Sequence, residues 1–189
     1  MKTLIFNGSP KKTGDTERLI NAFTKHLHGE IRTISFFDDI NPCMDCRDCW
    51  SKQGCTINDG MQEIYAYLHA CDNVVLASPI WFSSLSGPLL NMASRLQTLW
   101  AGRYFRKEKT GKAKNGVLII VGAEEGTEVI PTETALTIMK HMHVKLSDIS
   151  KIYSCNTNIL PAEKDEMALQ KCREAAIRLN DICGIGSKK

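Results

Sequence analysis

Short apolar runs alternate along the chain with longer segments whose apolar residues recur every three to four positions. The runs at 3–6 and 72–78, the second apolar on both faces, are typical of strands buried in a parallel sheet. Further strands are expected at 30–35, 116–122 and 148–154. The remaining segments predict helices at about 16–27, 60–70, 86–101, 132–143 and 161–183. This alternation predicts an α/β fold with a parallel sheet.

The turn after the first run combines glycines, hydroxyls and the start of a helix. Residues 7–16 read Asn-Gly-Ser-Pro-Lys-Lys-Thr-Gly-Asp-Thr. Backbone N–H groups at a helix N-terminus attract anions, and hydroxyl and ammonium groups can add to that site. The side chains that can contribute are those of Ser9, Lys11, Lys12, Thr13 and Thr16. The turn is therefore predicted to bind a phosphate group.

Two well-known phosphate loops are excluded. Five residues separate Gly8 from Gly14, and no Gly-Lys-Ser/Thr sequence follows, so the turn is not a Walker A loop. The G-x-G-x-x-G fingerprint of dinucleotide-binding folds is also absent from it. What remains is a hydroxyl-rich loop that suits a terminal phosphate monoester better than a pyrophosphate.

This turn resembles the FMN phosphate loop of flavodoxin-like NAD(P)H-dependent FMN reductases. Similar proteins also carry motifs seen here as Ser-Pro-Ile-Trp-Phe at 78–82 and Ser-Ser-Leu-Ser-Gly at 83–87. The resemblance implies that the first loop holds the FMN phosphate, that the second holds the ring system, and that the ring's far rim lies near 122–126. The residues it implies for FMN binding are Ser9, Lys11, Thr13, Gly14, Asp15, Thr16, Pro79, Ile80, Trp81, Phe82, Gly122, Ala123 and Gly126.

Two positions depart from the family pattern, and several motif residues could have a purely structural role. Asp15 stands where the family often has asparagine, which places a negative charge near the expected phosphate, and Trp81 stands where it often has tyrosine. Trp81 and Phe82 could instead be core residues, and Gly122 and Gly126 could serve only a tight turn.

Five strands with helices between them match the flavodoxin-like doubly wound sheet, in the strand order 2-1-3-4-5 with helices on both faces. In such sheets the ligand lies outside the carboxyl ends of the strands, at the switch point between the first and third. The turns at 8–16, 78–87 and 122–126 follow the first, third and fourth expected strands. We therefore expect these three turns to converge on one flavin.

A long irregular insertion at 36–59 contains four closely spaced cysteines, Cys43, Cys46, Cys49 and Cys55. Three thiolates three residues apart, closed by a fourth, can surround one iron–sulfur cluster, whereas zinc sites usually combine two distant pairs. The pattern resembles that of iron–sulfur flavoproteins, a branch of the same family, and implies a 4Fe-4S cluster beside FMN. Reduced thiols that pack the loop, zinc and a redox disulfide remain alternatives. The other four cysteines are expected to be structural.

Composition narrows the class of protein. A chain of 189 residues with 43% hydrophobic and 24% charged residues is expected to form a single domain spanning 1–189. The net charge of +3 is too small to suggest nucleic acid as a partner. There is no apolar run of 18 residues, so no membrane span or export signal is expected. These features predict a cytoplasmic protein whose cysteines are not paired as structural disulfides.

Few other motifs carry chemistry. The five histidines show no H-E-x-x-H spacing and no G-x-S-x-G elbow is present, so hydrolase chemistry is not indicated. The segment from position 103 to 114 contains six Lys or Arg residues and one Glu. This segment is expected to be a solvated loop, with binding of an NADPH phosphate as the alternative.

The predicted function is that of an FMN-dependent oxidoreductase. It would take hydride from NAD(P)H and pass electrons to a quinone, a second flavin or another acceptor. The alternatives are an electron carrier that relays electrons between partner proteins through FMN and the cluster, and a regulatory module. Similar reductases complete the flavin pocket with a neighbouring subunit, which implies a homodimer or homotetramer. The insertion and residues 100–105 are the expected interface.

Overall fold

A computed structural model describes residues 1–109 and 111–184 of the chain. Its strands are β1 (Lys2–Asn7), β2 (Glu30–Ser35), β3 (Asn73–Trp81), β4 (Ser84–Leu85), β5 (Lys114–Gly122) and β6 (Val144–Cys155). Its α-helices are α1 (Asp15–Thr24), α2 (Met61–Ala70), α3 (Gly87–Ser94), α4 (Gln97–Tyr104), α5 (Val129–His141) and α6 (Glu166–Ile182). Two short 3-10 helices complete the elements, η1 (Asp48–Trp50) and η2 (Ala162–Lys164).

Five parallel strands form the sheet in the order β2-β1-β3-β5-β6, and the two-residue β4 pairs antiparallel with the end of β3. The predicted flavodoxin-like order of parallel strands is confirmed. The additional β4 was not predicted because two residues are too short to show a periodic pattern.

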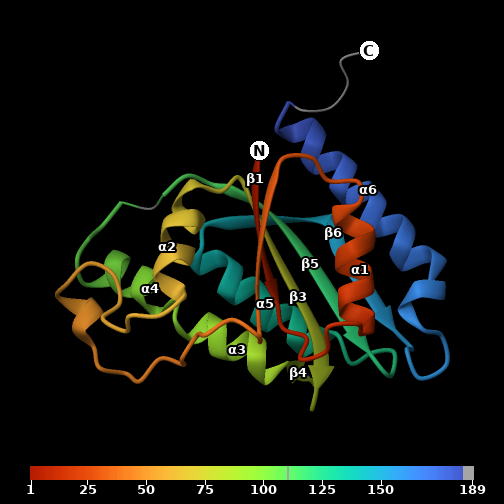
Figure 1. Cartoon of the computed structure of the whole chain (residues 1–189), viewed down its shortest axis with the longest axis horizontal. Helices are drawn as coiled ribbons and strands as arrows, with labels where there is room; N and C mark the ends of the chain where they lie inside the picture. Colours follow the sequence, from red (N-terminus) through yellow and green to blue (C-terminus); the bar gives the residue numbers. More distant parts are fainter. Residues whose placement is uncertain (110, 185–189) are drawn as a thin grey trace.

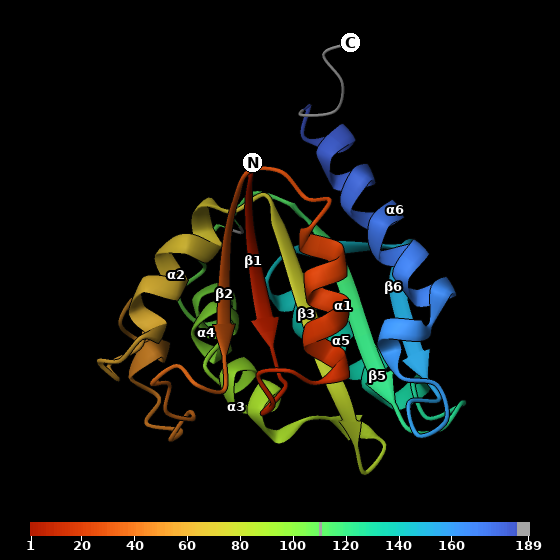
Figure 2. The same ribbon diagram turned by 45° about the vertical axis from the view of Figure 1, so that its right-hand side comes forward.

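Helices cover both faces of this sheet (Figures 1 and 2). Successive strand residues point to opposite faces, so Val74 and Leu76 of β3 pack with α2, α3 and α5, whereas Val75 and Ala77 pack with α1 and α6. Burial on both faces explains why the central strands are apolar at every position. None of the helices in the described chain is long and apolar enough to cross a membrane.

The single helix expected at 86–101 is wrong, because the chain forms α3 and α4 with a break at Arg95 and Leu96. The carbonyl of Arg95 accepts a hydrogen bond from Tyr65 Oη at 2.8 Å. The N–H of Leu99 donates to the carbonyl of Leu96, three residues back, instead of continuing the α-helical pattern from residue 95. A contact from α2 thus interrupts a segment whose apolar spacing is continuous.

The other boundaries shift by a few residues. β5 and β6 begin earlier than expected, because Lys114 pairs with Val144 at the start of the ladder. A register irregularity between Gly116 and Leu118 accommodates the longer β6. The last helix begins later than expected, at Glu166, after η2.

Candidate functional site

The first loop, residues 8–14, leads from β1 to the N-terminus of α1. Gly14 precedes the helix and makes no side-chain capping hydrogen bond. Ser9 and Thr16 are buried on either side of it. The first N–H groups of a helix lack partners within the helix, and the positive end of the helix dipole lies at the same place. The loop therefore fits a phosphate group.

The remaining side chains of this loop are either exposed or already hydrogen-bonded elsewhere. Lys11 and Thr13 are exposed. Lys12 Nζ lies 4.9 Å from the centre of the Phe37 ring. Asp15 Oδ1 accepts a hydrogen bond at 3.0 Å from the backbone N–H of Ala162, the first residue of η2. The Asp15 carboxylate is therefore held by a structural contact, and its backbone N–H is what remains for an anion.

A hydrogen-bonded joint connects this loop to the segment after β3. The N–H of Gly8 donates to the carbonyl of Ala77 at 2.8 Å, and Ser86 Oγ donates to the carbonyl of Gly8 at 2.7 Å. Ser78 Oγ accepts from the N–H of Ser86 at 2.9 Å. A Cβ at Gly8 would lie 2.6 Å from Ser86 Oγ and 2.7 Å from Leu89 Cβ, so a side chain does not fit there.

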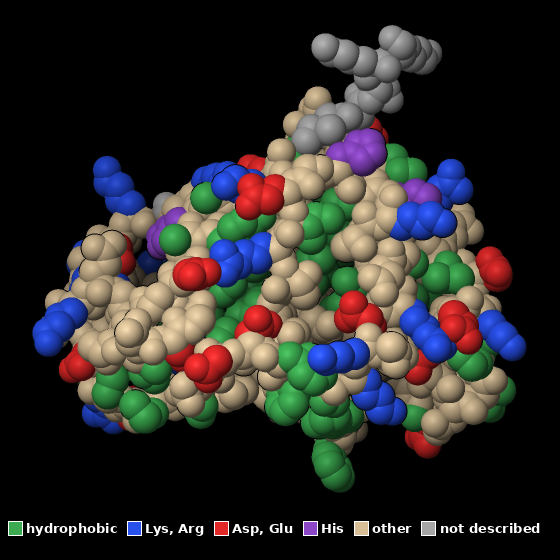
Figure 3. Space-filling model, in the orientation of Figure 1, with side chains coloured by type: hydrophobic (Ala, Val, Ile, Leu, Met, Phe, Trp, Pro, Cys, Tyr) green, Lys and Arg blue, Asp and Glu red, His purple; other side chains and the backbone are tan. Residues whose placement is uncertain are grey.

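The segment after β3 is a tight hairpin with an aromatic tip. Phe82 and Ser83 connect β3 to β4, with φ angles of 50° and 55°. Positive φ at both central residues is typical of a type I′ turn and is unfavourable for a bulky side chain. Trp81 is 43% exposed, Phe82 is fully exposed, and apolar side chains project at this edge of the molecule (Figure 3). These two rings are therefore not core residues.

The third loop, residues 122–126, lies against the same edge. A Cβ at Gly122 would come within 2.9 Å of Ile80 Cδ1, so the end of β5 directly contacts the end of β3. The backbone N–H and the Oγ1 of Thr157 both donate to the carbonyl of Gly122 at 3.0 Å. Gly126 has a φ of 82°, which favours glycine. Ala123 is exposed between them.

The three loops thus meet at the carboxyl edge of the sheet, as predicted. Together with the strand ends before them and the first turn of α1, they contain the residues that the resemblance implied for FMN binding. The N-terminus of α1 fits a phosphate group, and the hairpin exposes two aromatic rings at the same edge of the sheet. Sequence reasoning missed Ser86 as the residue that joins two of the loops, although it lies within the Ser-Ser-Leu-Ser-Gly motif.

A cavity of about 340 Å³ is lined by all four cysteines of the insertion. Within the described chain, no three Cys, His, Asp or Glu side chains are gathered closely enough to form a metal site. Burial raises the pKa of Cys49, and the neighbouring Cys43 and Cys55 raise it further, whereas Arg106 lowers it. The thiols are thus near enough to influence one another, and soft thiolate donors suit an iron–sulfur cluster.

A buried ion pair holds the insertion in place. The Arg95 side chain is fully buried and Asp59 is 2% exposed, and Arg95 Nη1 lies 2.5 Å from Asp59 Oδ2. Arg95 also donates to the carbonyls of Asn41 and Ile57, which lie before Cys43 and after Cys55. One guanidinium therefore holds both ends of the cysteine segment. No sequence motif pointed to this residue.

The aromatic residues expected at a subunit interface have partners within the chain. The Trp50 ring stacks on Phe105 with a centroid distance of 4.3 Å, and Trp100 stacks on Tyr104 at 5.2 Å. The first contact attaches η1 of the insertion to the end of α4, whereas the second lies within α4. Tyr104 and Phe105 remain partly exposed, and the oligomeric state stays a prediction.

The cysteines expected to be structural differ in environment. Cys71 and Cys172 are buried, and burial raises the pKa of Cys71 to about 11 and that of Cys172 to about 12. Cys155 and Cys183 are only half-buried. The pKa of Cys155 is raised to about 11, first by burial and then by the charge of Glu128. Burial also raises the pKa of Cys183. All four thiols are therefore protonated at neutral pH.

The basic segment at 103–114 is not simply a solvated loop, so that expectation is wrong for part of it. Arg103 lies in α4, and Lys114 begins β5 and is only 5% exposed. Together with Arg106 these residues line a cavity. The sequence did not indicate this because a run of charges on an irregular segment usually faces water.

Comparison with known proteins places this geometry in a family. Residues 1–150 match the family model described as NADPH-dependent FMN reductase. An iron–sulfur flavoprotein of Methanosarcina thermophila is 28% identical over 190 residues, covering 96% of this chain and 95% of its own. An iron–sulfur flavoprotein of Archaeoglobus fulgidus is 25% identical, covering 95% of this chain and 79% of its own.

Solved structures share the fold. The NAD(P)H:quinone oxidoreductase of Methanothermobacter marburgensis has a TM-score of 0.69 at 16% identity, covering 95% of this chain and 96% of that one. An FMN-dependent NADH-azoreductase of Bacillus anthracis, in complex with FMN, has a TM-score of 0.65 at 16% identity, covering 95% and 99%. The family model spans most of the sheet and all three converging loops. The chain belongs to the NADPH-dependent FMN reductase family of oxidoreductases.

Proposed function

We propose that the protein binds FMN at the carboxyl edge of its sheet, takes hydride from NAD(P)H and passes electrons to a quinone, a second flavin or another acceptor. The observation that carries the proposal is the joint in which Ser86 Oγ donates to the carbonyl of Gly8, because it aligns the phosphate loop with the aromatic hairpin. When bound, FMN supplies the hydride acceptor, and the protein supplies placement and electrostatics.

Each loop has a separate task in this proposal. The N–H groups at the start of α1, with Ser9 and Thr16, hold the phosphate. The backbone of the β3–β4 hairpin, from Pro79 to Phe82, would hold the ring system. The loop at 122–126 limits the far rim. No acid–base pair is assigned, since the cofactor accepts the hydride.

Removing the two buried hydroxyls tests the phosphate assignment. The Ser9→Ala/Thr16→Ala variant is expected to bind FMN more weakly while its affinity for riboflavin, which lacks the phosphate, changes little. Each lost charge-assisted hydrogen bond costs roughly 1.5–3 kcal/mol. Quenching of flavin fluorescence measures both affinities. Thr24→Ala, which removes a hydroxyl at the far end of α1, is the matched control. Equal losses for FMN and riboflavin, or release of FAD alone from the purified protein, would contradict the assignment.

A second candidate function is that of an iron–sulfur flavoprotein that carries electrons between partner proteins. It is favoured by the four cysteines, which line one cavity, and by Arg95, which hydrogen-bonds to the backbone at both ends of their segment. The relatives named above also bear the name iron–sulfur flavoprotein. In this proposal Cys43, Cys46, Cys49 and Cys55 bind a 4Fe-4S cluster, which adds single-electron transfer to the flavin chemistry.

A Cys49→Ser variant distinguishes the two candidates. Protein prepared without oxygen is expected to contain about four iron atoms per chain, as the cluster defines. Cys49→Ser should lose iron and keep FMN, because the flavin loops lie on other segments. Cys183→Ser, at the end of α6, is the control and should keep both. Iron analysis and the visible spectrum provide the readouts. If wild-type protein prepared without oxygen contains no iron and still oxidises NAD(P)H, the electron-carrier proposal is excluded and the FMN reductase proposal stands.

A further inference from the structure

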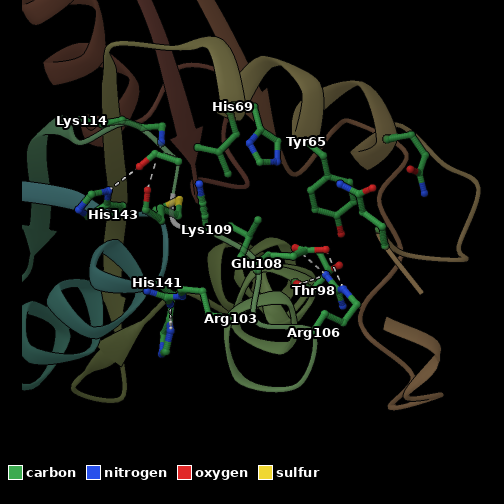
Figure 4. Close-up of a pocket in the computed structure, with 17 residues that line it drawn as sticks. Tyr65, His69, Thr98, Arg103, Arg106, Glu108, Lys109, Lys114, His141 and His143 are labelled. Atoms are coloured by element: carbon green, nitrogen blue, oxygen red, sulfur yellow. Dashed lines mark hydrogen bonds and ion pairs between the residues drawn. The ribbon is translucent and has the colours of Figure 1, made fainter. Parts of the chain in front are cut away.

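A cavity of about 250 Å³ lies at the opposite edge of the sheet from the flavin loops (Figure 4). It adjoins the start of β5 at Lys114 and the turn before β6 at His143. β5 has nine residues, so its two ends are about 26 Å apart at the rise of a strand. A phosphate bound at the first loop therefore cannot occupy this cavity.

Basic groups reach the cavity from three sides. Figure 4 shows His69 above it from α2, Arg103 and Arg106 below it from α4 and the turn that follows, and Lys114 and His143 at one end. Among the described residues that line it, Glu108 is the only acidic one. The cavity is therefore strongly positive.

Among the residues that the structure describes, most of these cations have no carboxylate partner. Glu108 is bound to Arg106 through Nε at 2.8 Å and Nη2 at 3.0 Å. Arg103 Nη2 donates instead to His141 Nδ1 at 2.7 Å, and burial together with the charge of Arg103 lowers the pKa of His141, so this imidazole is a neutral acceptor. Within the part of the chain that the structure describes, Lys114 Nζ donates to two backbone carbonyls, those of residues 112 and 142.

Two buried donors are left for a ligand. The Arg106 side chain is 11% exposed, and its Nη1 is buried without a hydrogen-bond partner in the described structure. An ammonium group has three donors, and the two carbonyls account for two of those of Lys114. Unpaired buried donors are costly, and native structures usually satisfy them with water or an ion. Burial also lowers the pKa of Lys114, as expected for a cation without a counter-ion.

We propose that this cavity is a second ligand site, which binds a phosphate-class oxyanion through Arg103, Arg106, Lys109 and Lys114. A tetrahedral anion presents acceptors in several directions at once, which matches donors that converge from different elements. The volume is several times the roughly 30 Å³ of one water molecule, so a phosphate fits with space beside it for a small ester group. Arginine is well suited to this role because its planar donors match phosphate oxygens.

Calorimetric titration of the FMN-loaded protein with inorganic phosphate tests the proposal, with chloride at equal ionic strength as the blank. Saturable binding is expected for the wild type. Arg103→Gln/Lys109→Gln should weaken it by roughly 10-fold or more, since two charged donors are lost. Lys107→Gln removes a charge from the same segment outside the cavity and should change it by less than about 2-fold. Unfolding temperatures verify that each variant is folded, and Arg103→Lys should recover part of the binding.

Two further comparisons identify the source of the anion and the location of the site. Titration with adenosine 2′-phosphate in place of inorganic phosphate identifies the source: tighter binding would indicate a nucleotide phosphate, and equal or weaker binding would indicate the free ion. The proposal would be overturned if the wild type shows no saturable binding of phosphate, or if Lys107→Gln weakens phosphate binding as much as Arg103→Gln/Lys109→Gln does. A heat that disappears in Ser9→Ala/Thr16→Ala protein but persists in Arg103→Gln/Lys109→Gln protein would place the anion at the flavin loop and also overturn it.

Discussion

Arg95→Met is expected to destabilise the protein by about 3–5 kcal/mol, the usual cost of removing one partner of a buried ion pair. The substitution leaves the buried carboxylate of Asp59 without its guanidinium and frees the carbonyls of Asn41 and Ile57. Denaturation by urea measures the loss. Because this guanidinium holds both ends of the cysteine segment, we also expect the reactivity of the four thiols toward a thiol reagent to rise.

Arg32→Met is the matched control for that substitution. Arg32 forms an ion pair with Glu63 in which the two side chains are 40% and 73% exposed. Such surface pairs contribute about 0–1 kcal/mol, and neither residue of this pair belongs to the insertion. If the two variants lose similar amounts of stability, or if thiol reactivity is unchanged in Arg95→Met, Arg95 does not hold the cysteine segment in place.

The same ion pair gives a pH dependence with a definite sign. Burial raises the pKa of Asp59, but hydrogen bonds from Arg95 and from the N–H groups of Asn41 and Met61 outweigh it and lower the pKa below its ordinary value. The stabilisation is complete above the unfolded pKa of about 3.9 and is lost as the pH falls through the lower folded value. The difference in stability between the wild type and Arg95→Met should therefore shrink in acid.

Gly8→Ala is expected to weaken FMN binding by roughly 10- to 100-fold, because overpacking of a tight contact costs about 1–3 kcal/mol. The new Cβ would lie within 2.7 Å of both Ser86 Oγ and Leu89 Cβ, so the phosphate loop and the hairpin must move apart. The hydrogen bond from Ser86 to the carbonyl at position 8 would lengthen with them. A fluorescence titration with FMN measures the affinity, and thermal unfolding measures the cost in stability.

Gly87→Ala provides the control at the same joint. Gly87 begins α3, one residue after Ser86, and a Cβ there would meet nothing within 4 Å. Alanine is a better helix former and restricts the unfolded chain, so this variant should be neutral or slightly more stable. FMN affinity that falls equally in both variants, or in neither, would argue against the joint as the feature that aligns the flavin loops.

Much of the flavin edge could be predicted from the sequence. The strand at 30–35 and the helix ending at residue 70 coincide with β2 and α2, and the three loops lie where the strand order places them. These features depend on local patterns: apolar runs form buried strands, glycine and serine form turns, and parallel strands end at one edge. The spacing of the four cysteines likewise placed them around one cavity.

The contacts that hold these parts together could not be read in the same way. Arg95 and Asp59 are 36 positions apart, and Ser86 and Gly8 are 78 positions apart. Neither pair belongs to a periodic pattern, and an arginine within an apolar helical stripe ordinarily reaches water. The break between α3 and α4 depends on Tyr65, whose hydroxyl occupies a carbonyl that the helix would otherwise use.

The sequence by itself determined the class of fold, because alternating apolar runs and helical patterns follow from the chemistry of neighbouring residues, and the match to the flavodoxin-like sheet predicted the order of the parallel strands. Tertiary structure alone decided which charges are buried. Lys114 and Arg106 belong to one run of basic residues, yet the packing of α2, α4 and α5 around the start of β5 encloses both in a cavity. Burial depends on what the rest of the chain places around a residue, and no local pattern contains that information.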